Sequence, residues 1–410
     1  MPGPPGELRE RVRAVPGMDR LLPLLVELPP AHLVGGAVRD LLRYEPAVDL
    51  DVALEGDAVA AALELAERMG GRAVRHDRFG TATVTAADGL TFDVAATRRE
   101  SYPQPGSLPR VRPAPLKDDL ARRDFAVNAM AIGLTGDDLG HMRDPLDGLA
   151  DLANKVVRVL HERSFEDDPT RILRAARYEA RLGFAMDPAT EGFAREAVAG
   201  GALDTVSGER IGEELLKLLA ETEAGRAVGR LGDLEADVAL HPELHAEAEL
   251  VAGAELGALE TGADRALAGL AALAVGSPSK LGDWIGTLGL DAQRREAAGR
   301  AARTAPLLAG ELARPLRPSE IRALLRREPP EALAVSLALG APAEPVLRWA
   351  RELQHTRLAI SGNDLIAEGI APGPAVGAAL EETLRRTLDG DVEGREEQLA
   401  LAVRVAREGS

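Results

Sequence analysis

The stretch from His32 to Leu54 reads HLVGGAVRDLLRYEPAVDLDVAL, and it places two adjacent glycines between a short apolar run and a helical pattern. Gly35 and Gly36 carry no side chains, so the backbone here can approach a ligand closely. The helix expected to start near Ala37 would present free N–H groups and the positive end of its dipole to a phosphate. Arg39, one turn into that helix, is expected to reach the same anion with a bidentate contact. The turn therefore predicts a phosphate site.

An Asp-x-Asp pair closes the stretch. Asp49 and Asp51 are expected on one face of a strand, because side chains there repeat with period two. Adjacent carboxylates repel unless a cation joins them, and oxygen ligands beside a phosphate site suit Mg²⁺. This is the combination that nucleotidyl transfer assisted by two metal ions requires. Asp93, in the segment TFDVAA, lies on another predicted strand that could run beside the first, so it is either a third carboxylate or a strand-end cap.

Each of these features has a plainer interpretation. A Gly-Gly pair before a helix is commonly just a tight turn, and Asp-x-Asp in a strand is commonly a solvated face. Their occurrence together, in this order and spacing, favours the site. A dinucleotide-binding turn is disfavoured, because GGAVRD lacks the Gly-x-Gly-x-x-Gly spacing and no acidic residue closes a second strand at the expected distance.

The composition limits the class of protein. With 410 residues, 45% of them hydrophobic but only 3% aromatic, the chain is expected to form several domains with cores of Leu, Ala and Val. The absence of cysteine excludes disulfides and thiolate metal sites. The net charge of −17 argues mildly against nucleic acid as a partner, although basic residues outnumber acidic ones between Arg98 and Arg123. No signal peptide or membrane-spanning apolar run is recognisable, so a cytoplasmic location is expected.

The pattern of the chain changes near residue 155. Before it, strand-like runs at 47–54, 79–86 and 90–96 flank a helix expected over 57–70. Segments with helical period predominate after it. The basic, Pro-rich segment 97–119 is expected to be a long loop, and such loops are usually functional or disordered. These patterns predict an α/β head followed by a long helical part.

Taken together, the motifs resemble those of class II tRNA nucleotidyltransferases, which comprise the CCA-adding enzymes and their bacterial poly(A) polymerase relatives. The opening stretch resembles the family's first motif, and LARRDFAVNAMAI, beginning at Leu120, is similar to its Arg-Arg-Asp-Phe-x-x-Asn-Ala motif. Four later segments are also similar to family motifs: Asp144–Leu160, Ser164–Phe184, Ser207–Leu219 and Ser361–Leu399.

The resemblance implies an α+β chain. Its polymerase-β-like nucleotidyltransferase head would be a small mixed sheet with helices, followed by an all-α neck, body and tail. The implied domains are an N-terminal leader helix over 1–29, the head over 30–150, a helical neck with the nucleotide-selecting motif over 151–225, and a tRNA-binding body and tail over 226–410. The helical C-terminal half is therefore expected to hold the tRNA and to carry no chemistry of its own.

The resemblance also implies roles for the site residues. Asp49 and Asp51 would hold the metal ions. A nucleotide-binding cluster would meet the triphosphate and the ribose hydroxyls, with its aspartate capping the start of a helix. The cluster consists of Arg122, Arg123, Asp124 and Asn128.

Asp168 and Arg171 are spaced so that they share one face if both lie in a helix. The plain interpretation of this spacing is an i,i+3 salt bridge. The resemblance implies instead that the pair selects the incoming base. A carboxylate accepts from the exocyclic amino group that cytosine and adenine share, and a guanidinium donates to a ring nitrogen or carbonyl. Arg174, one turn further, is expected to contact phosphate.

The expected function is Mg²⁺-dependent, template-independent addition of C, C and A to the 3′ end of tRNA from CTP and ATP. The expected partners are the tRNA acceptor end and these two nucleotides, with no membrane association and with monomer and dimer both left open. Alternatives within the class are CC addition only, A addition only and poly(A) addition. A non-catalytic RNA-binding protein that retains the fold is disfavoured by the intact pair of Asp49 and Asp51.

Overall fold

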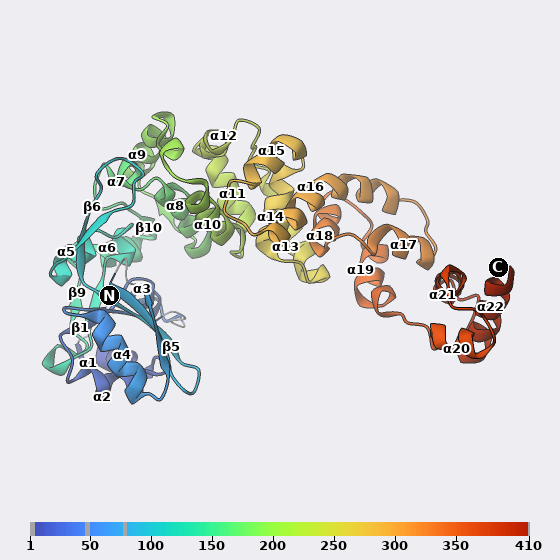
Figure 1. Cartoon of the computed structure of the whole chain (residues 1–410). Helices are drawn as coiled ribbons and strands as arrows, with labels where there is room; N and C mark the ends of the chain where they lie inside the picture. The colour runs from blue at the N-terminus through green and yellow to red at the C-terminus, as the bar shows by residue number, and fades with distance from the viewer. Residues whose placement is uncertain (1–4, 46–49, 77–79, 409–410) are drawn as a thin grey trace. The chain divides into compact units, whose positions relative to one another are not determined.

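The computed structural model describes residues 5–45, 50–76 and 80–408. The chain divides into two compact units, one formed by Met1–Ser207 with Asp233–Leu240 and the other by Gly208–Gly232 with His241–Ser410. In the described residues the first unit contains the sheets and the second is helical (Figure 1). The predicted α+β class, with a small mixed sheet and helices at the N-terminal end, is confirmed. The domain boundaries expected after residues 29, 150 and 225 stay predictions.

The main sheet of the first unit, within its described residues, has seven strands in the order β3-β4-β5-β2-β1-β8-β9. The pair β2–β5 is parallel and the other neighbours are antiparallel, which makes the sheet mixed. The strands are β1 (Ala31–Val34), β2 (Asp51–Leu54), β3 (Arg72–His76), β4 (Thr81–Thr85), β5 (Thr91–Ala96), β8 (Ala131–Gly133) and β9 (Met142–Arg143).

Helix α4 (Ala58–Arg68) packs against β3, β4 and β5 (Figure 1). Asp57 caps its start, because the carboxylate accepts a hydrogen bond from the backbone N–H of Ala60 at 3.0 Å. After the helix the chain passes Gly71, where a Cβ would stand 2.0 Å from the carbonyl oxygen of Thr85. The expected helix is confirmed, and strands occur within each of the three runs expected to form them.

The segment predicted as a leader helix contains two helices in its described part, α1 (Pro5–Ala14) and α2 (Met18–Leu25). Val12, Met18 and Leu21 are fully buried in the same apolar core as the sheet strands. The described part of this segment therefore shares its apolar core with the sheet.

The expected long loop 97–119 is wrong, because the segment contains an antiparallel hairpin of β6 (Arg98–Ser101) and β7 (Arg110–Pro113) and the start of helix α5 (Leu116–Ala121). At the hairpin tip, the N–H of Gly106 donates to the carbonyl of Glu166 at 3.2 Å. The prolines that suggested a loop lie between the strands and at the end of β7, where a missing N–H costs little.

Short helices complete the first unit around the sheet. A small parallel pair of strands joins residues 156–157 to residues 185–186 within the first unit. The remaining elements are α3 (Gly36–Leu42), α5 (Leu116–Ala121), η2 (Ala126–Asn128), η3 (Gly136–Asp138), α6 (Gly148–Asn154), β10 (Val156–Val157), α7 (Ser164–Asp167), α8 (Thr170–Leu182), β11 (Ala185–Met186), α9 (Pro188–Ala199), η4 (Ala202–Thr205) and α12 (Ala236–Leu240).

The second unit is built around one buried helix, α14 (Arg265–Ala274), whose residues after the first are all buried. Close packing between α13 (Ala248–Thr261) and α18 (Pro330–Ala338) depends on Gly257, where a Cβ would stand 2.5 Å from the carbonyl oxygen of Ala334. The other elements before the tail are α10 (Gly208–Leu219), α11 (Ala224–Asp233), α13 (Ala248–Thr261), α15 (Pro278–Ile285), α16 (Ala292–Leu312), α17 (Pro318–Leu325), α18 (Pro330–Ala338), α19 (Ala343–Arg351) and η5 (Leu353–His355).

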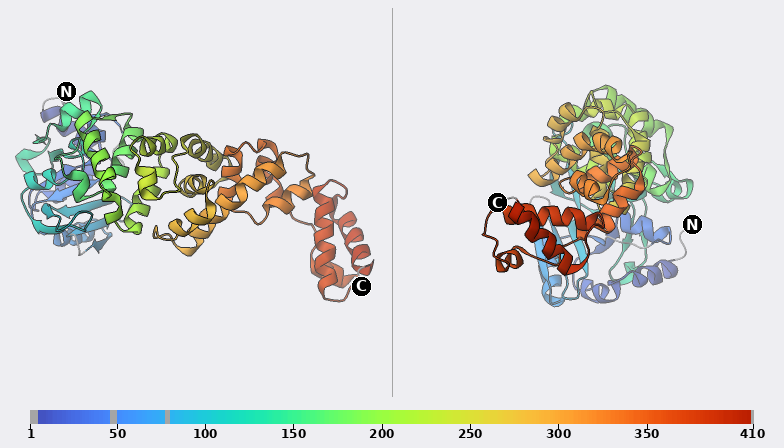
Figure 2. Two further views of the ribbon diagram at one scale, coloured as in Figure 1. Left: turned by 90° about the horizontal axis from the view of Figure 1, so that it is seen from above. Right: turned by 90° about the vertical axis from the view of Figure 1, so that its right-hand side faces the viewer.

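The tail of the second unit has its own apolar core, which includes Leu365 and Ala402. It consists of α20 (Gly362–Ala367), α21 (Pro374–Leu388) and α22 (Gly394–Glu408), and α21 lies side by side with α22 in every view (Figures 1 and 2). Among the described residues, no helix is both long enough and apolar enough to cross a membrane.

Candidate active site

The glycine turn leaves the strand β1 and enters helix α3 through Gly35. Its φ of 69° and ψ of −136° are readily adopted only by glycine. A Cβ at this position would stand 3.0 Å from Nη1 of Arg123 and 3.6 Å from Oδ2 of Asp51. The missing side chain therefore leaves space between a guanidinium group and a carboxylate. The turn is present as expected, and its binding of phosphate stays a prediction.

The carboxylates of Asp51 and Asp93 lie on neighbouring strands. Asp51 begins β2, and its register partner on the parallel strand β5 is Asp93. In-register side chains share a face on strands about 5 Å apart, so the pair is adjacent. The expected pairing of these strands is confirmed, whereas Asp49 lies outside the described residues. The donor set is all oxygen and so fits a hard cation such as Mg²⁺, although the described residues form no group of three or more possible ligands.

Arg122 and Arg123 follow helix α5 and are held by Asp119, which is 1% exposed. The Asp119 carboxylate accepts from Nε of Arg122 at 2.9 Å and from Nη2 of Arg123 at 2.8 Å. Burial by itself raises the pKa of Asp119, but the charges of Arg123 and Arg122 outweigh burial and leave that pKa below its usual value. The ionised carboxylate thus fixes both arginines at the edge of one cleft.

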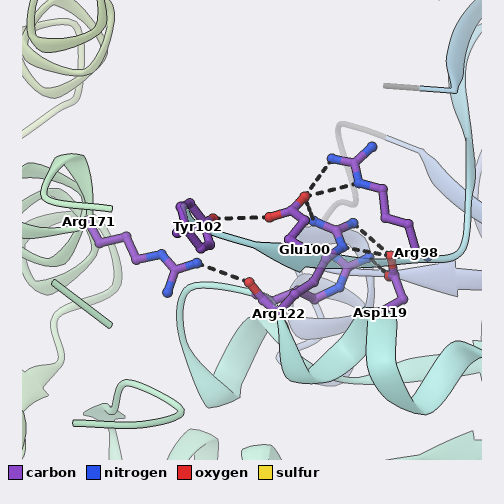
Figure 3. Close-up of polar contacts among 7 residues, drawn as sticks. Arg98, Glu100, Tyr102, Asp119, Arg122 and Arg171 are labelled. Atoms are coloured by element: carbon purple, nitrogen blue, oxygen red, sulfur yellow. Dashed lines mark hydrogen bonds and ion pairs between the residues drawn. The ribbon is translucent and has the colours of Figure 1, made fainter. Parts of the chain in front are cut away.

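Glu100 and Tyr102 reach the same cleft from the hairpin, and the sequence analysis did not single them out as site residues (Figure 3). Oε1 of Glu100 accepts from Nη1 of Arg122 at 2.9 Å and from Nε of Arg98 at 3.0 Å. The Tyr102 hydroxyl donates to Oε2 of Glu100 at 3.1 Å, and burial raises the pKa of Tyr102 so that it remains a donor. Period-two spacing of Arg98, Glu100 and Tyr102 is the signal that could have placed them on one face.

Arg39 differs from its expected role. It is 2% exposed and bidentate to Asp40, with Nε 2.8 Å from Oδ1 and Nη2 3.0 Å from Oδ2. Its Nη1 donates to Oδ1 of Asn128 at 2.6 Å. Because Asp40 already occupies the fork that would grip an anion, the expected bidentate phosphate contact is corrected. Arg39 instead supports Asn128 from behind the cleft.

Asn128 continues this network towards helix α8. Its Nδ2 donates to Oδ1 of Asp124 at 3.1 Å, and Oδ2 of Asp124 accepts from Nε of Arg174 at 3.0 Å. Burial raises the pKa of Asp124, but Arg174 outweighs burial and the net pKa is about 2. Asp124 also accepts from the N–H of Phe125 at 2.8 Å, but Phe125 is the N-cap of the short helix η2 and no side chain caps that helix, so the capping role expected of Asp124 is wrong. Arg174, expected at a phosphate, is an ion-pair partner of Asp124 and still lines the cleft.

Asp168 lies just before α8, in the turn that starts the helix, and not on its face as the spacing suggested. Its Oδ1 accepts from the N–H of Thr170 at 3.1 Å and from the Thr170 hydroxyl at 2.6 Å. Arg171 is within the helix, and its Nη2 donates to the carbonyl of Arg122 at 3.0 Å (Figure 3). Its Nη1 donates to Oγ of Ser164 at 2.5 Å. These side-chain hydrogen bonds orient the guanidinium group without the Asp168 carboxylate.

These residues surround one cleft of about 300 Å³ within the first unit. The cleft brings together ten of the expected site residues, while Arg39 and Asp93 are not part of its lining and Asp49 is not described. Three lining residues were not expected: Glu100, Tyr102 and Tyr178. The ring of Tyr178 lies 5.4 Å from the guanidinium of Arg39 and 5.7 Å from that of Arg174. The lining residues are Gly35, Gly36, Asp51, Glu100, Tyr102, Arg122, Arg123, Asp124, Asn128, Asp168, Arg171, Arg174 and Tyr178.

Comparison with known proteins identifies the family of this chain. Residues 31–158 match the Poly A polymerase head domain, and residues 183–247 match the probable RNA and SrmB-binding site of polymerase A. The CC-adding tRNA nucleotidyltransferase of Deinococcus radiodurans is 35% identical over 371 residues, which covers 89% of this chain and 87% of that protein. The chain belongs to the tRNA nucleotidyltransferase family.

Other members of the family match over different lengths. The A-adding tRNA nucleotidyltransferase of Geobacter sulfurreducens is 44% identical over 215 residues, 52% of this chain, and the match spans only 24% of that relative's length. The Thermotoga maritima CCA-adding enzyme complexed with tRNA is similar with a TM-score of 0.77 and 30% identity, covering 99% of this chain and 98% of that one. A CCA-adding enzyme in complex with CTP has a TM-score of 0.76 and 31% identity, with 98% and 97% covered.

Proposed function

We propose that this protein adds C, C and A to the 3′ end of tRNA from CTP and ATP without a nucleic-acid template. The observation that carries the proposal is that the glycine turn, Asp51, Asp168 and Arg171 line one cleft. In this proposal Asp51 and the backbone of the turn meet the reacting phosphates, and Arg171 and Asp168 offer a donor and an acceptor for a base. A nucleotide with its reacting phosphate at Asp51 could therefore place its base at Arg171.

The base-reading end is matched to cytosine and adenine. Both bases present an amino group beside an unprotonated ring nitrogen, whereas uracil and guanine present a carbonyl beside an N–H. A carboxylate at Asp168 can accept from the amino group, and Arg171 has N–H groups beyond the pair held by Ser164 and Arg122 with which to donate to the ring nitrogen. The buried bonds of Arg171 fix its plane, which suits recognition of a flat base edge.

The triphosphate end is supplied by Gly35, Gly36, Arg122 and Arg123. The backbone of the turn, which lines the cleft, and the guanidinium groups held by Asp119 offer N–H donors to phosphate oxygens. Asn128, whose amide orientation is fixed by Arg39 and Asp124, would meet a sugar hydroxyl.

The residues that would hold Mg²⁺ are Asp49, Asp51 and Asp93, on strands that lie side by side where they are described. When bound there, two Mg²⁺ ions supply activation of the RNA 3′-hydroxyl and neutralisation of the leaving pyrophosphate. The chain's own contribution is to hold the carboxylates together and to keep the nucleotide phosphates beside them.

CC addition alone is a second candidate, because the Deinococcus radiodurans relative matched over most of both chains is named as CC-adding. The deciding experiment incubates the full-length protein with labelled CTP or ATP and with one of two tRNAs. The first tRNA lacks all three terminal nucleotides, and the second lacks only the last one. Complete CCA addition predicts that the first tRNA incorporates from CTP and the second from ATP. Incorporation from CTP without incorporation from ATP would assign CC addition, and no incorporation on either tRNA would exclude both functions.

The carboxylate assignment has its own test. Asp51→Asn should reduce transfer by orders of magnitude while the unfolding midpoint stays close to that of the wild type, because a ligand is lost and a charge repulsion is relieved. Asp57→Asn, at the cap of α4 and away from the cleft, is the matched control and should retain transfer. An Asp51→Asn variant that is as active as this control would remove Asp51 from the site.

A further inference from the structure

Asp93 has a hydrogen-bonded support on the exposed face of the sheet. The Thr83 hydroxyl donates to Oδ1 of Asp93 at 2.6 Å, and Nε2 of His76 lies 3.2 Å from the Thr83 hydroxyl oxygen. The three residues come from β5, β4 and β3, which are consecutive neighbours in the sheet. The contacts therefore form a short row that leads away from the carboxylate pair.

The strand register explains why this row exists. Asp51 is paired with Asp93 across β2 and β5, and Asp93 is paired with Thr83 across β5 and β4. In-register residues share a face, so the three side chains stand in one line across the strands. Val84 and Val94, on the opposite face of β4 and β5, are fully buried in the core. That burial holds the register, because a slip by one residue would exchange the two faces.

The direction of each hydrogen bond follows from the chemistry of the groups. A carboxylate has no proton to give, so the only hydroxyl proton of Thr83 goes to Asp93. The Thr83 oxygen must then accept from His76, which places a proton on Nε2 of that ring. The separation of 2.6 Å is in the range of about 2.5–2.7 Å expected for a hydroxyl that donates to a carboxylate.

We propose that Thr83, supported by His76, is a positioning residue that holds Asp93 in the orientation needed to share a divalent cation with Asp51. The proposal rests on the proposed function, which gives the carboxylates a metal to hold. A hydroxyl bonded to one carboxylate oxygen limits rotation of the side chain and leaves the other lone pairs for the cation. Outer partners of this kind orient ligands, and their loss commonly weakens metal binding by about tenfold or more.

The variants separate the hydroxyl from the shape of the side chain. Thr83→Val removes the hydroxyl and keeps a β-branched strand residue, whereas Thr83→Ser keeps the hydroxyl. Thr85→Val is the matched control, because Thr85 lies on the same strand and face but is paired with Thr91 instead of Asp93. Thermal unfolding of each variant checks the fold, and Thr83→Ala replaces Thr83→Val if the latter does not fold.

The measurement is the affinity of the full-length protein for Mn²⁺ alone, from the electron paramagnetic resonance signal of the free ion. We expect Thr83→Val to bind Mn²⁺ about tenfold more weakly than the wild type, with Thr83→Ser and Thr85→Val close to it. Asp93→Asn should lose at least as much affinity. Adding Thr83→Val to Asp93→Asn should cause no further loss, because the hydroxyl then has no carboxylate to orient.

The outcomes distinguish this proposal from the proposed function. Wild-type affinity in Thr83→Val, or an equal additional loss in the Asp93→Asn background, would overturn the positioning role. If the Mn²⁺ pattern is as expected but the wild type adds no nucleotide to tRNA, the positioning role stands and the proposed function fails. If the expected Mn²⁺ pattern and nucleotide addition by the wild type are both observed, Thr83→Val should also need more Mg²⁺ for half-maximal nucleotide addition than Thr85→Val does.

Discussion

Arg39 and Asn128 are 89 residues apart in the sequence, yet Nη1 of Arg39 donates to Oδ1 of Asn128 at 2.6 Å. On its other side Asn128 donates to Asp124, so a cation and a carboxylate together determine which end of its amide is oxygen. One N–H and one lone pair of that amide are left to serve a ligand in the cleft. Helix α3, which follows the glycine turn, and the motif from Arg122 to Asn128 are therefore joined into one structural unit.

Breaking this unit at Arg39 should destabilise the fold. Arg39→Met should lower the free energy of unfolding by about 3 kcal/mol, because Asp40 is left largely buried without its cation. Urea denaturation measures the loss, and adding Asp40→Asn should restore part of it. Arg43→Met is the control on the same helix end, where the ion pair with Glu45 is partly exposed and worth about 1 kcal/mol or less. Equal losses in the two single variants would contradict the buried-pair account.

The Asp124–Arg174 pair should make stability depend on acidic pH. The folded pKa of Asp124 is about 2, below an unfolded value of about 3.9. A depressed pKa stabilises the fold above the unfolded value, and the contribution disappears as the pH falls from about 4 to about 2. The stability advantage of the wild type over Asp124→Asn should thus be constant from neutral pH to about pH 5 and shrink by about 2 kcal/mol below it. A difference that stays constant down to about pH 2 would disprove the linkage.

Selection of the base should depend on the carboxylate of Asp168. Asp168→Asn puts an amide that can donate where the wild type can only accept, so misincorporation of U relative to C should rise. A lost base contact of this kind is worth about 1–3 kcal/mol of discrimination. Single-nucleotide incorporation from each labelled triphosphate measures the ratio. Asp167→Asn, at the neighbouring position outside the cleft lining, should leave the ratio unchanged; an unchanged ratio in Asp168→Asn itself would end the base-reading assignment.

The tail should contribute to tRNA binding and not to nucleotide binding. Its apolar core is formed within residues 360–406, so a chain that ends at Arg357 should retain the cores of the rest of the molecule. We expect this variant to bind CTP as the full chain does and to bind tRNA more weakly at matched salt, as measured by filter binding. Equal tRNA affinity in the two chains would show that the tail only packs.

The features of the site that follow from local pattern could be predicted from the sequence. The glycine turn depends on two residues without side chains, and the two-residue period of the strands placed Asp51 and Asp93 on exposed faces. The Arg-Arg-Asp motif likewise concentrates charge over a few positions next to buried apolar residues. For the turn and the strands the residue types and their spacing were sufficient, because the relevant neighbours are close in the chain, whereas the roles expected of Arg122 and Arg123 came from the family resemblance.

What the sequence determined by itself is which side chains share a face on the strands that it predicted. Only the tertiary structure decided which groups these side chains contact. Arg39 was expected at a phosphate and is held by Asp40 and Asn128, while the hairpin brings in Glu100 and Tyr102. The physical reason is that periodicity specifies the direction of a side chain within its own element. The group it meets depends on strand order and helix packing, which arise from burial summed over the whole core.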